Sequence, residues 1–586
     1  MSRALTLAVL LLSSFAVSQQ ATTINVLTRM NDNQHTGQNL QETILTPTNV
    51  NSTSFGKIFS YSVDGQVYAQ PLYVQNLTMA TGGVHNVVFV ATEYDSVYAF
   101  DADSAIANPQ PLWHVNFLNP PAIQPVSCSE GSGICQLYPL VGITATPVID
   151  LATNTIYVEV RTQEISNGVT SWVQRIHALN ITSGAEQPNS PAVICSAQGR
   201  NGCALSNQSS TVIFGPAHQQ SRVGTMLVPE PGFPQGVYFI GFSGDSGWVL
   251  AYDPVSLQLL AGWYTDDEQV HTTAFLNAPG AANNWVGAGF GVTMPGIFPG
   301  IPGEGHSGIW GAGTGLSADS NGYVYAITGD GYWDGSVNWG DSLVKLQLQY
   351  NSSTKTYSLV PVDYFTTSDQ ACRDAHGLDY GSAGPLILPT QPGATYPNLI
   401  FTTGKQVKTC ESTFEGYVIN ANNMGHTGGQ VSQMSLSNGG GEQPAAYWYN
   451  GTTQYIYNGS DGDPLRAYTL STAGVSTNSV MATQAAFDSG LNPVISANGT
   501  QNGIVWGLER IDDPDEYQPG TSPWVLHAFN ANTLAELYNT TQASAGRDTP
   551  GPNLKMTVPT VANGKVYVPT QTELDIYGLC PCPATH

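Results

Sequence analysis

The sequence predicts an all-β protein folded as a single eight-bladed β-propeller, and two observations carry this prediction. Pairs of apolar, β-branched and aromatic runs recur along the 586 residues, with turn signals between them. The last copy of this unit ends one strand short, near the C-terminus. Repeated short strands with intervening turns, and no convincing amphipathic helix, are typical of radial β architectures.

The repeat is clearest in "VVFVATEYDSVYAFDADS", residues 87–104, where two β runs flank a polar turn and end on an acidic corner. Eight such corners align along the chain, and a strand rich in Pro or small residues usually comes before each unit. Their central residues are Phe100, Leu179, Tyr252, Leu346, Ile419, Tyr468, Phe529 and Tyr577. A four-stranded unit buries little surface alone, so we expect the units to pack face to face around an axis.

The final unit lacks its fourth strand, and "FGKIFSYSV" at residues 55–63 directly precedes the first unit. We expect this N-terminal strand to pair with the last one, because joining both termini in one blade closes the ring and removes exposed edges. The predicted organisation is a signal peptide at residues 1–18, one propeller at 19–579 and a short tail at 580–586.

The composition excludes several classes of function. The formal net charge is -25, the pI is near 4.5 and only 10% of residues are charged. Nucleic acids and anionic membrane surfaces require basic patches, so we expect binding to neither. No GxGxxG sequence stands in a strand–helix context and no CxxCH sequence is present, so neither NAD nor haem is expected.

The N-terminus resembles a secretory signal, with Arg3, the apolar run "ALTLAVLLLSSFAV", and small residues at Ala16 and Ser18. Nine Asn-X-Ser/Thr sequons are consistent with a glycoprotein: Asn51, Asn76, Asn180, Asn207, Asn351, Asn450, Asn458, Asn498 and Asn539. The apolar run is too short to span a membrane, so we predict no membrane insertion. We expect the protein to be extracellular and monomeric.

Eight cysteines are present, which suits a disulfide-bonded exported protein. Six of them form local couples, so the expected bonds are Cys128–Cys135, Cys195–Cys203 and Cys372–Cys410. Spacing alone leaves the pairing open among 105 combinations.

The corner sequences "AFDADSA", "ALNITSG", "AYDPVSL" and "AFNANTL" resemble the repeat of pyrroloquinoline quinone (PQQ) propellers over roughly residues 24–579. The stretch "GIWGAGTGLSADSNGYVYAITGDGYWDGSVNWGDSLVKL", residues 308–346, resembles quinoprotein alcohol dehydrogenases more closely, in its order of a Trp, a "TGD" turn, a second Trp and a "GD" pair. The adjacent cysteines of that family and a fused haem domain are missing. Electrons would therefore pass to an external acceptor.

This resemblance implies roles for individual residues. It places Trp310 under the cofactor, Asp330 and, in "SGDSG", Asp245 on a calcium ion, and Asp379 of "HGLDYG" as the group that takes the substrate proton. Lys405 of "TTGKQ" would reach the quinone. Arg222 of "QSRVG" lies at the entrance of an expected innermost strand, and we predict it as a further cofactor contact facing the axis.

Two functions remain open from the sequence. The first is a secreted PQQ- and calcium-dependent oxidoreductase acting on an alcohol, a sugar or a small hydroxylated metabolite. The second is a non-catalytic extracellular propeller that binds a glycan, peptide or protein, because fold does not determine function. Each residue also has a structural interpretation: Trp310 as a cover of the channel floor, Asp330 as a turn residue and Lys405 as a solvated or paired cation.

Overall fold

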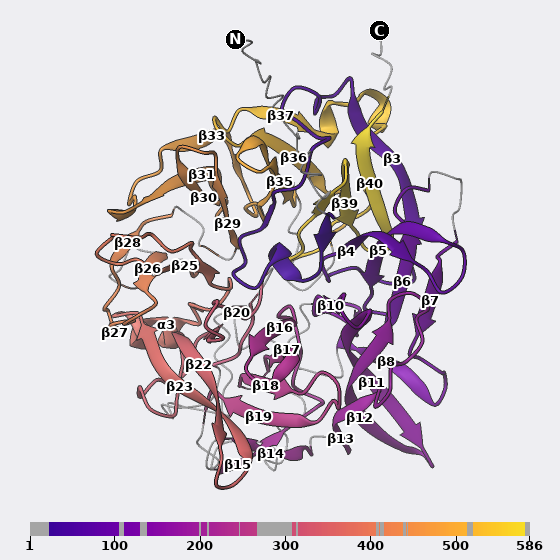
Figure 1. The fold of residues 1–586 in the computed structure, drawn as a ribbon, viewed down its shortest axis with the longest axis vertical. Coiled ribbons are helices and arrows are strands. Elements are labelled where there is room, and N and C mark those ends of the chain that lie inside the picture. Colours follow the sequence, from indigo (N-terminus) through magenta and orange to yellow (C-terminus); the bar gives the residue numbers. More distant parts are fainter. Residues whose placement is uncertain are drawn as a thin grey trace, which may run out of the picture.

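The computed structural model describes residues 23–104, 110–128, 137–198, 201–207, 210–244, 246–266, 307–311, 314–405, 410, 415–436, 441, 443–511 and 520–580. The predicted all-β class is confirmed, because β-sheets account for nearly all regular structure in these ranges. Figure 1 shows the sheets following one another around a common centre, which is the arrangement of a β-propeller. The predicted signal peptide and most of the predicted tail lie outside the described residues.

Eight sheets of four or more strands are described, and we number them by their order along the ring. Sheet 1 contains β1 (Asn25–Val26), β4 (Leu72–Thr78), β5 (Val84–Ala91), β6 (Ser96–Asp101) and β7 (Trp113–Asn116). Sheet 2 contains β8 (Ile123–Ser127), β9 (Leu140–Val141), β10 (Val148–Asp150), β11 (Thr155–Ser166), β12 (Val169–Asn180) and β13 (Ala192–Gln198). Sheet 3 contains β16 (Met226–Glu230), β17 (Phe233–Phe242), β18 (Trp248–Tyr252) and β19 (Leu259–Tyr264). Sheet 4 contains β20 (Ser317–Ala318), β21 (Val324–Ile327), β22 (Ser342–Asn351), β23 (Thr356–Thr366) and β27 (His426–Thr427).

The second half of the chain continues the series. Sheet 5 contains β24 (Leu386–Ile387), β25 (Leu399–Thr403), β26 (Gly416–Asn420) and β28 (Ser432–Met434). Sheet 6 contains β29 (Ala445–Tyr449), β30 (Gln454–Asn458), β31 (Asp463–Ser471), β32 (Gly474–Val475) and β33 (Met481–Phe487). Sheet 7 contains β2 (Gln38–Asn39), β34 (Val494–Asn498), β35 (Gln501–Glu509), β36 (Val525–Asn530) and β37 (Glu536–Asn539). Sheet 8 contains β3 (Phe55–Ser62), β38 (Thr560–Ala562), β39 (Lys565–Pro569) and β40 (Glu573–Leu579). A separate hairpin joins β14 (Cys203–Asn207) and β15 (Ser210–Phe214).

The hydrophobic core is divided into layers between neighbouring sheets. Val249 of β18 and Val344 of β22 belong to one buried cluster, which lies between sheets 3 and 4. Phe401 of β25 and Ile456 of β30 belong to another, between sheets 5 and 6. Because a sheet in such a series is covered on both faces, its middle strands read as continuous apolar runs, as in β18, where every residue is buried.

The expected N-terminal strand forms as β3 and pairs antiparallel with β40, in a register from Phe55 opposite Leu579 to Ser62 opposite Glu573. The Phe55 ring lies 6.4 Å from the Tyr577 ring, centroid to centroid, in a stacked arrangement. Sheet 8 therefore combines an early strand with the last three strands of the chain. Figure 1 shows this as an indigo strand beside yellow ones.

Residues 28–39, which we call the central segment, occupy the middle of the ring, a role that the sequence pattern did not predict. Figure 1 shows this segment in indigo near the centre, and it includes the short 3₁₀ helix η1 (Arg29–Asn31). Hydrogen bonds join it to residues on, or within two positions before, the first main strand of every sheet. These residues are Gln70, Thr146, Thr225, Ala318, Ile387, Tyr447, Ile495 and Val561. The central segment therefore fills the axis that the sequence analysis treated as a channel.

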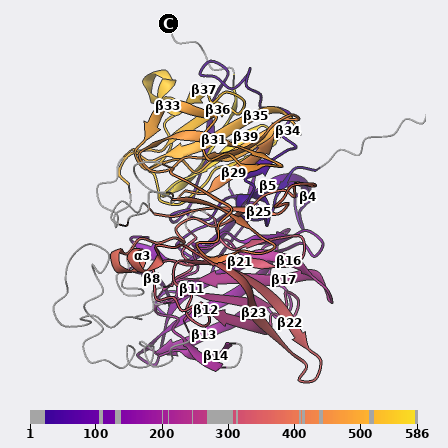
Figure 2. The ribbon, with the colours of Figure 1, turned by 90° about the vertical axis from the view of Figure 1, so that its left-hand side faces the viewer.

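Helical structure is scarce in the described ranges. It comprises η1, the α-helix α3 (Gln370–His376), η3 (Thr540–Gln542) and η4 (Ser544–Gly546). None of these is long and apolar enough to cross a membrane. Figure 2 shows α3 at one side of the ring, viewed edge-on.

Candidate functional site

The predicted site residues lie at one edge of sheets 3, 4 and 5. Arg222, Trp310 and Asp379 precede the first strands β16, β20 and β24, whereas Asp330 and Lys405 follow the second strands β21 and β25. Adjacent strands of these sheets are antiparallel, so the start of the first strand and the end of the second meet at the same edge. The topology therefore brings together residues that are far apart in sequence.

Asp379 and Lys405 form a close ion pair at the edge of sheet 5. Nζ of Lys405 lies 2.7 Å from Oδ2 of Asp379. The backbone N–H of Lys405 also donates to the backbone carbonyl of Asp379 at 2.9 Å. Burial by itself would raise the pKa of Asp379, but the Lys405 ammonium and the hydrogen bonds received by the carboxylate outweigh burial and lower the pKa to about 2. Asp379 is therefore ionised at neutral pH.

Asp330 lies beside the same carboxylate. Its backbone N–H donates to Oδ1 of Asp379 at 3.0 Å. Burial raises the pKa of Asp330 well above its ordinary range, and the negative charge of Asp379 raises it further. The pKa values of the two neighbouring aspartates are therefore shifted in opposite directions, and Asp330 keeps its proton to a higher pH than Asp379 does. Carboxyl pairs whose pKa values are driven apart are typical of acid–base sites.

Gly329 permits the close approach of Trp310 to this pair. A Cβ atom on Gly329 would lie 2.3 Å from Oδ1 of Asp379 and 2.8 Å from Cδ1 of the Trp310 ring. No side chain fits there without displacing one of them. On the Trp310 ring, the Arg222 guanidinium carbon stands 4.8 Å from the ring centroid, as in a cation–π contact. Nε of Arg222 donates to Oε1 of Gln220 at 3.1 Å, which holds the guanidinium in place.

Asp341 is a third buried acid next to this group, and the sequence analysis noted it only as part of a motif. Its backbone N–H donates to the carbonyl of Gly329 at 2.7 Å. Its Oδ1 accepts the backbone N–H of Tyr380 at 2.9 Å, whereas the buried Oδ2 accepts no hydrogen bond from the described residues. Burial raises the pKa of Asp341 well above its usual range. Asp341 thus joins the turn after β21 to the segment that carries Asp379.

Arg373 on α3 is a positioning residue that the sequence analysis missed. Its Nη1 donates to the backbone carbonyl of Lys405 at 3.3 Å, and its Nε pairs with Oδ1 of Asp369 at 3.1 Å. The side chain is fully buried. No repeat motif marks Arg373, because its partner Lys405 is brought close only by the fold.

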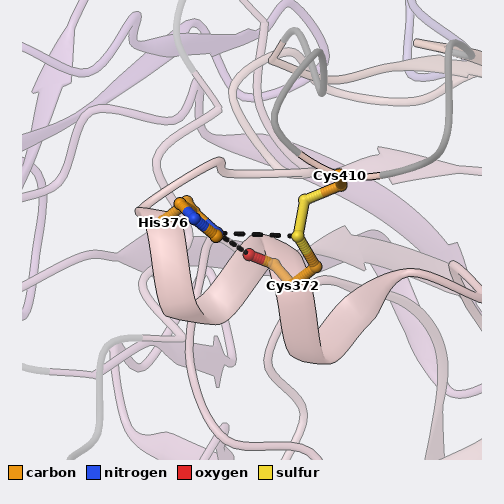
Figure 3. Close-up of side chains that lie close together, drawn as sticks. All are labelled: Cys372, His376 and Cys410. Atoms are coloured by element: carbon orange, nitrogen blue, oxygen red, sulfur yellow. Dashed lines mark hydrogen bonds between the residues drawn. A yellow bond between two sulfur atoms is a disulfide. The ribbon is translucent and has the colours of Figure 1, made fainter.

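The disulfide Cys372–Cys410 ties α3 to the segment that follows Lys405, as Figure 3 shows. This bond and Cys195–Cys203 confirm two of the expected pairings. Cys128 is also disulfide-bonded, but its expected partner Cys135 lies outside the described residues. The helix that carries Arg373 is therefore covalently fixed to the chain near the ion pair.

His376 completes a group of three potential metal ligands with this disulfide. Its Nδ1 lies 3.5 Å from Sγ of Cys372 and 2.8 Å from the carbonyl oxygen of the same residue (Figure 3). A metal binds the thiolate form of cysteine, and both sulfur atoms here are joined to each other. The group is therefore a disulfide with a neighbouring imidazole and does not act as a metal centre while the bond is intact.

The described residues offer a planar ligand an aromatic face, and they include one of the two predicted calcium ligands, Asp330. Trp310 supplies an aromatic face with the Arg222 guanidinium against it, and the Lys405 ammonium is paired with Asp379. Calcium takes six to eight oxygen ligands as a rule. Within the described ranges, no three carboxylates bring their oxygens within 4.8 Å of one another. Of the two predicted calcium ligands, Asp330 is described and Asp245 lies outside those ranges.

The structure thus brings together Trp310, Asp330, Asp379 and Lys405, and Arg222 joins them through its contact with the Trp310 ring. Their catalytic or binding roles stay predictions, because geometry alone assigns no activity. The acids and cations are nevertheless arranged to do two things. They hold side by side two carboxyl groups whose pKa values are shifted in opposite directions, and they place the Arg222 guanidinium next to the Trp310 ring.

Comparison with known proteins supports the fold. No protein-family model and no curated protein sequence matches the chain. A quinohemoprotein alcohol dehydrogenase from Pseudomonas putida HK5 superimposes with a TM-score of 0.54 at 13% identity, over 96% of this chain and 81% of the other. BamB from Moraxella catarrhalis has a TM-score of 0.44 at 12% identity, over 89% of this chain and 99% of its own. At such identities the likeness concerns the fold alone: the chain has the β-propeller fold that the Pseudomonas dehydrogenase also has.

Proposed function

We propose that this protein is an oxidoreductase that binds pyrroloquinoline quinone and dehydrogenates an alcohol, a sugar or another small hydroxylated metabolite. One observation carries the proposal: an ionised carboxylate, Asp379, is held between Lys405 and Asp330 and directly beside the Trp310 ring. The fold shared with a quinohemoprotein alcohol dehydrogenase adds support.

Each side chain has a defined task in this proposal. Trp310 stacks against the planar cofactor, and Arg222 and Lys405 balance its negative charge. Asp379 accepts the hydroxyl proton of the substrate, because its low pKa keeps it ionised. Asp330, whose pKa is raised by burial and by the charge of Asp379, limits the negative charge next to that carboxylate. When bound, the quinone supplies the two-electron acceptor for the substrate hydride.

A second function, a non-catalytic propeller that binds a glycan, peptide or protein, is favoured by one observation. The Lys405 ammonium already neutralises Asp379 at 2.7 Å, and a closed ion pair of this kind also serves as a purely structural contact. The same pair therefore supports both functions, and only ligand binding and turnover distinguish them.

We also propose the finer architecture and location. The eight sheets are blades of one propeller at residues 19–579, and pairing of β3 with β40 closes the ring. The chain is an exported glycoprotein that works as a monomer and passes electrons to an external acceptor. Of its sequons, Asn458 is only 2% exposed and its Nδ2 donates to the Gln443 carbonyl at 3.4 Å, so we expect no glycan on this residue.

The test is reconstitution of purified full-length protein with the quinone, with and without calcium. We expect a changed absorption spectrum of the quinone and alcohol-dependent reduction of an electron-accepting dye. Asp379→Asn should keep the spectral change and lose turnover, whereas Asp488→Asn, at an exposed position, should keep both. A protein that alters no quinone spectrum under either condition and reduces no dye would contradict the proposal and leave the binding propeller as the better account.

A further inference from the structure

The Cys372–Cys410 disulfide and the imidazole beside it form a compact set of potential metal ligands. One sulfur atom from each cysteine and one ring nitrogen of His376 all lie within 4.8 Å of one another. Figure 3 shows the imidazole next to the sulfur of Cys372. Two sulfurs and an imidazole nitrogen are donors that zinc prefers, in contrast to the oxygen ligands that calcium takes.

The helix α3 places two of these ligands on one face. Cys372 and His376 are four positions apart, and residues at this spacing lie one turn apart on the same side of a helix. The helix ends at His376, because Gly377 adopts a left-handed conformation with a φ of 63°. The backbone N–H of Gly377 donates to the carbonyls of Arg373 and Asp374, which caps the last turn. The backbone that carries His376 is therefore fixed.

The distance between the imidazole and the nearer sulfur already suits a zinc ion. In a tetrahedral site, Zn–S bonds of about 2.3 Å and Zn–N bonds of about 2.0 Å set sulfur and nitrogen about 3.6 Å apart. Nδ1 of His376 lies 3.5 Å from Sγ of Cys372. Two sulfur ligands of the same ion lie about 3.8 Å apart. Cleavage of the disulfide frees the sulfur of Cys410 to move to such a distance, while the pair on α3 needs little change.

Contacts other than the disulfide hold α3 in place. Nε of Arg373 donates to Oδ1 of Asp369 at 3.1 Å, and its Nη1 donates to the carbonyl of Lys405 at 3.3 Å. Nε2 of Gln370 donates to the carbonyl of Gly331 at 2.7 Å. These hydrogen bonds connect the helix to sheets 4 and 5 without involving sulfur. The two ligands on α3 therefore keep their positions when the disulfide is reduced.

The group is accessible from one side. His376 is exposed and Cys372 is partly exposed, whereas Cys410 is only 4% exposed. A reductant and a metal ion can therefore approach through Cys372 and His376 without unfolding of the helix. The buried third ligand contributes the less solvated side of the group.

We propose that, when the Cys372–Cys410 disulfide is reduced, the two thiolates and His376 bind a zinc ion. The same three residues then have two states, a disulfide with a neighbouring imidazole and a metal centre. The reduced state exists in every newly made chain, because disulfides form only over seconds to hours. This inference does not rest on the proposed function, since it uses other side chains and needs neither the quinone nor calcium.

Reduction and metal binding together move two electrons and two protons. A water-soluble phosphine breaks the S–S bond and is oxidised to its oxide with the oxygen atom of water, while the two sulfurs gain two electrons and two protons. Zinc then replaces both thiol protons, which pass to the solvent. Nδ1 of His376 donates its hydrogen to the carbonyl of Cys372 at 2.8 Å. When Nδ1 binds zinc, this hydrogen moves to Nε2, so the imidazole stays neutral.

The test is zinc binding by the full-length protein, measured by competition with a chelating dye before and after reduction with the phosphine under native conditions. We expect the reduced protein to bind zinc and the oxidised protein not to bind it at this position. Calcium should not displace the zinc, because calcium prefers oxygen ligands. Cobalt in place of zinc should give the visible absorption of tetrahedral thiolate coordination. A reduced protein that binds no zinc would overturn the inference.

Variants locate the metal ion. His376→Ala should weaken zinc binding by the reduced protein at least about tenfold, because it removes one ligand and leaves all cysteines in place. Cys372→Ser/Cys410→Ser should abolish binding at this position. His426→Ala removes another exposed histidine, on β27, and should leave zinc binding unchanged. Equal zinc affinity of the reduced wild type and reduced His376→Ala would overturn the inference.

Melting temperatures decide the case in which reduction weakens the fold. A ligand that binds only the folded protein raises its melting temperature. Zinc should therefore raise the melting temperature of the reduced wild type and not that of the oxidised protein. The rise should be lost in His376→Ala and kept in Cys195→Ser/Cys203→Ser, which removes the other described disulfide. If reduction alone unfolds the protein, zinc present during reduction should preserve the fold of the wild type. The same effect of zinc on wild type and His376→Ala would contradict the proposal.

Discussion

Nζ of Lys405 lies 2.7 Å from Oδ2 of Asp379, while the backbone N–H of Lys405 donates to the backbone carbonyl of the same residue at 2.9 Å. The two residues are thus joined by side chain and by backbone, across the edge where β24 begins and β25 ends. This double connection keeps the ammonium on the carboxylate, and it makes the protonation of Asp379 depend on Lys405.

Lys405→Met should destabilise the protein at neutral pH. The pKa of Asp379 is lowered from 3.8 to about 2, so the ion pair contributes stability that is present above about pH 4 and is lost as the pH falls toward 2. The shift corresponds to about 2 kcal/mol of unfolding free energy. Chemical denaturation of wild type and variant at pH 7 and pH 3 measures it, and the gap should narrow at pH 3. Lys565→Met, which breaks a surface pair, is the control and should cost less than about 1 kcal/mol.

Asp330→Asn should stabilise the protein as the pH rises above about 4, the ordinary pKa of an aspartate. The folded-state pKa of Asp330 is raised, so the native state retains a proton that the unfolded chain releases above pH 3.8. Each pH unit between the two pKa values then lowers the unfolding free energy of the wild type by about 1.4 kcal/mol. An asparagine side chain does not titrate in this pH range, so the variant does not lose this unfolding free energy. Melting temperatures from pH 3 to pH 8 should diverge with rising pH, and a variant no more stable than wild type at pH 8 would contradict the assignment.

Gly329→Ala should damage the candidate site directly. The new methyl group would lie 2.3 Å from Oδ1 of Asp379, so the carboxylate or the Trp310 ring must move. We expect a loss of about 1–3 kcal/mol of unfolding free energy, together with a change in Trp fluorescence. Gly215→Ala is the matched control, because the nearest atom to its added Cβ lies 3.9 Å away.

Removal of the Cys372–Cys410 disulfide should loosen Lys405. The double variant Cys372→Ser/Cys410→Ser opens a loop with a sequence separation of 38, for which we expect a loss of about 2–4 kcal/mol. If α3 positions the ion pair, the stability lost through Lys405→Met should be smaller in this background than in wild type, which a double-mutant cycle measures. The control Cys195→Ser/Cys203→Ser removes a bond with a separation of 8 and should leave the effect of Lys405→Met unchanged.

Much of the fold was predictable because the local pattern of apolar residues indicates where the strands lie. The β runs around Phe89 and Tyr98 became the buried middle strands of sheet 1, since apolar side chains on both faces require neighbours on both faces. The pairing of residues 55–63 with the last strand was predictable from the number of strands. The last unit of the chain has only three strands and needs a fourth from the N-terminal end of the chain.

The site was predictable only in part. The motif order placed Trp310, Asp330 and Asp379 near one another, but the pKa difference between the two aspartates depends on burial and on the Lys405 ammonium, neither of which a motif encodes. Arg373 carries no signal of its own, because its side chain donates to a backbone carbonyl that only the fold brings close. The central segment was missed for a similar reason. Its contacts are mainly hydrogen bonds that involve the backbone, which leave no periodic pattern of side chains.

The central segment also limits the order in which contacts can form during synthesis. Residues 28–39 are made early, but the side chain of Asn39 donates to the carbonyl of Val561, which is 522 positions later. At about 5–20 residues per second, the ribosome takes roughly half a minute to two minutes to make that partner. The contacts of the segment with Gln70 and Thr146 become available early, whereas the contact of Asn39 waits for the last sheet. Any chain that stops before Val561 lacks this contact of Asn39, so the last residue of the central segment gains its partner only after nearly the whole protein has been made.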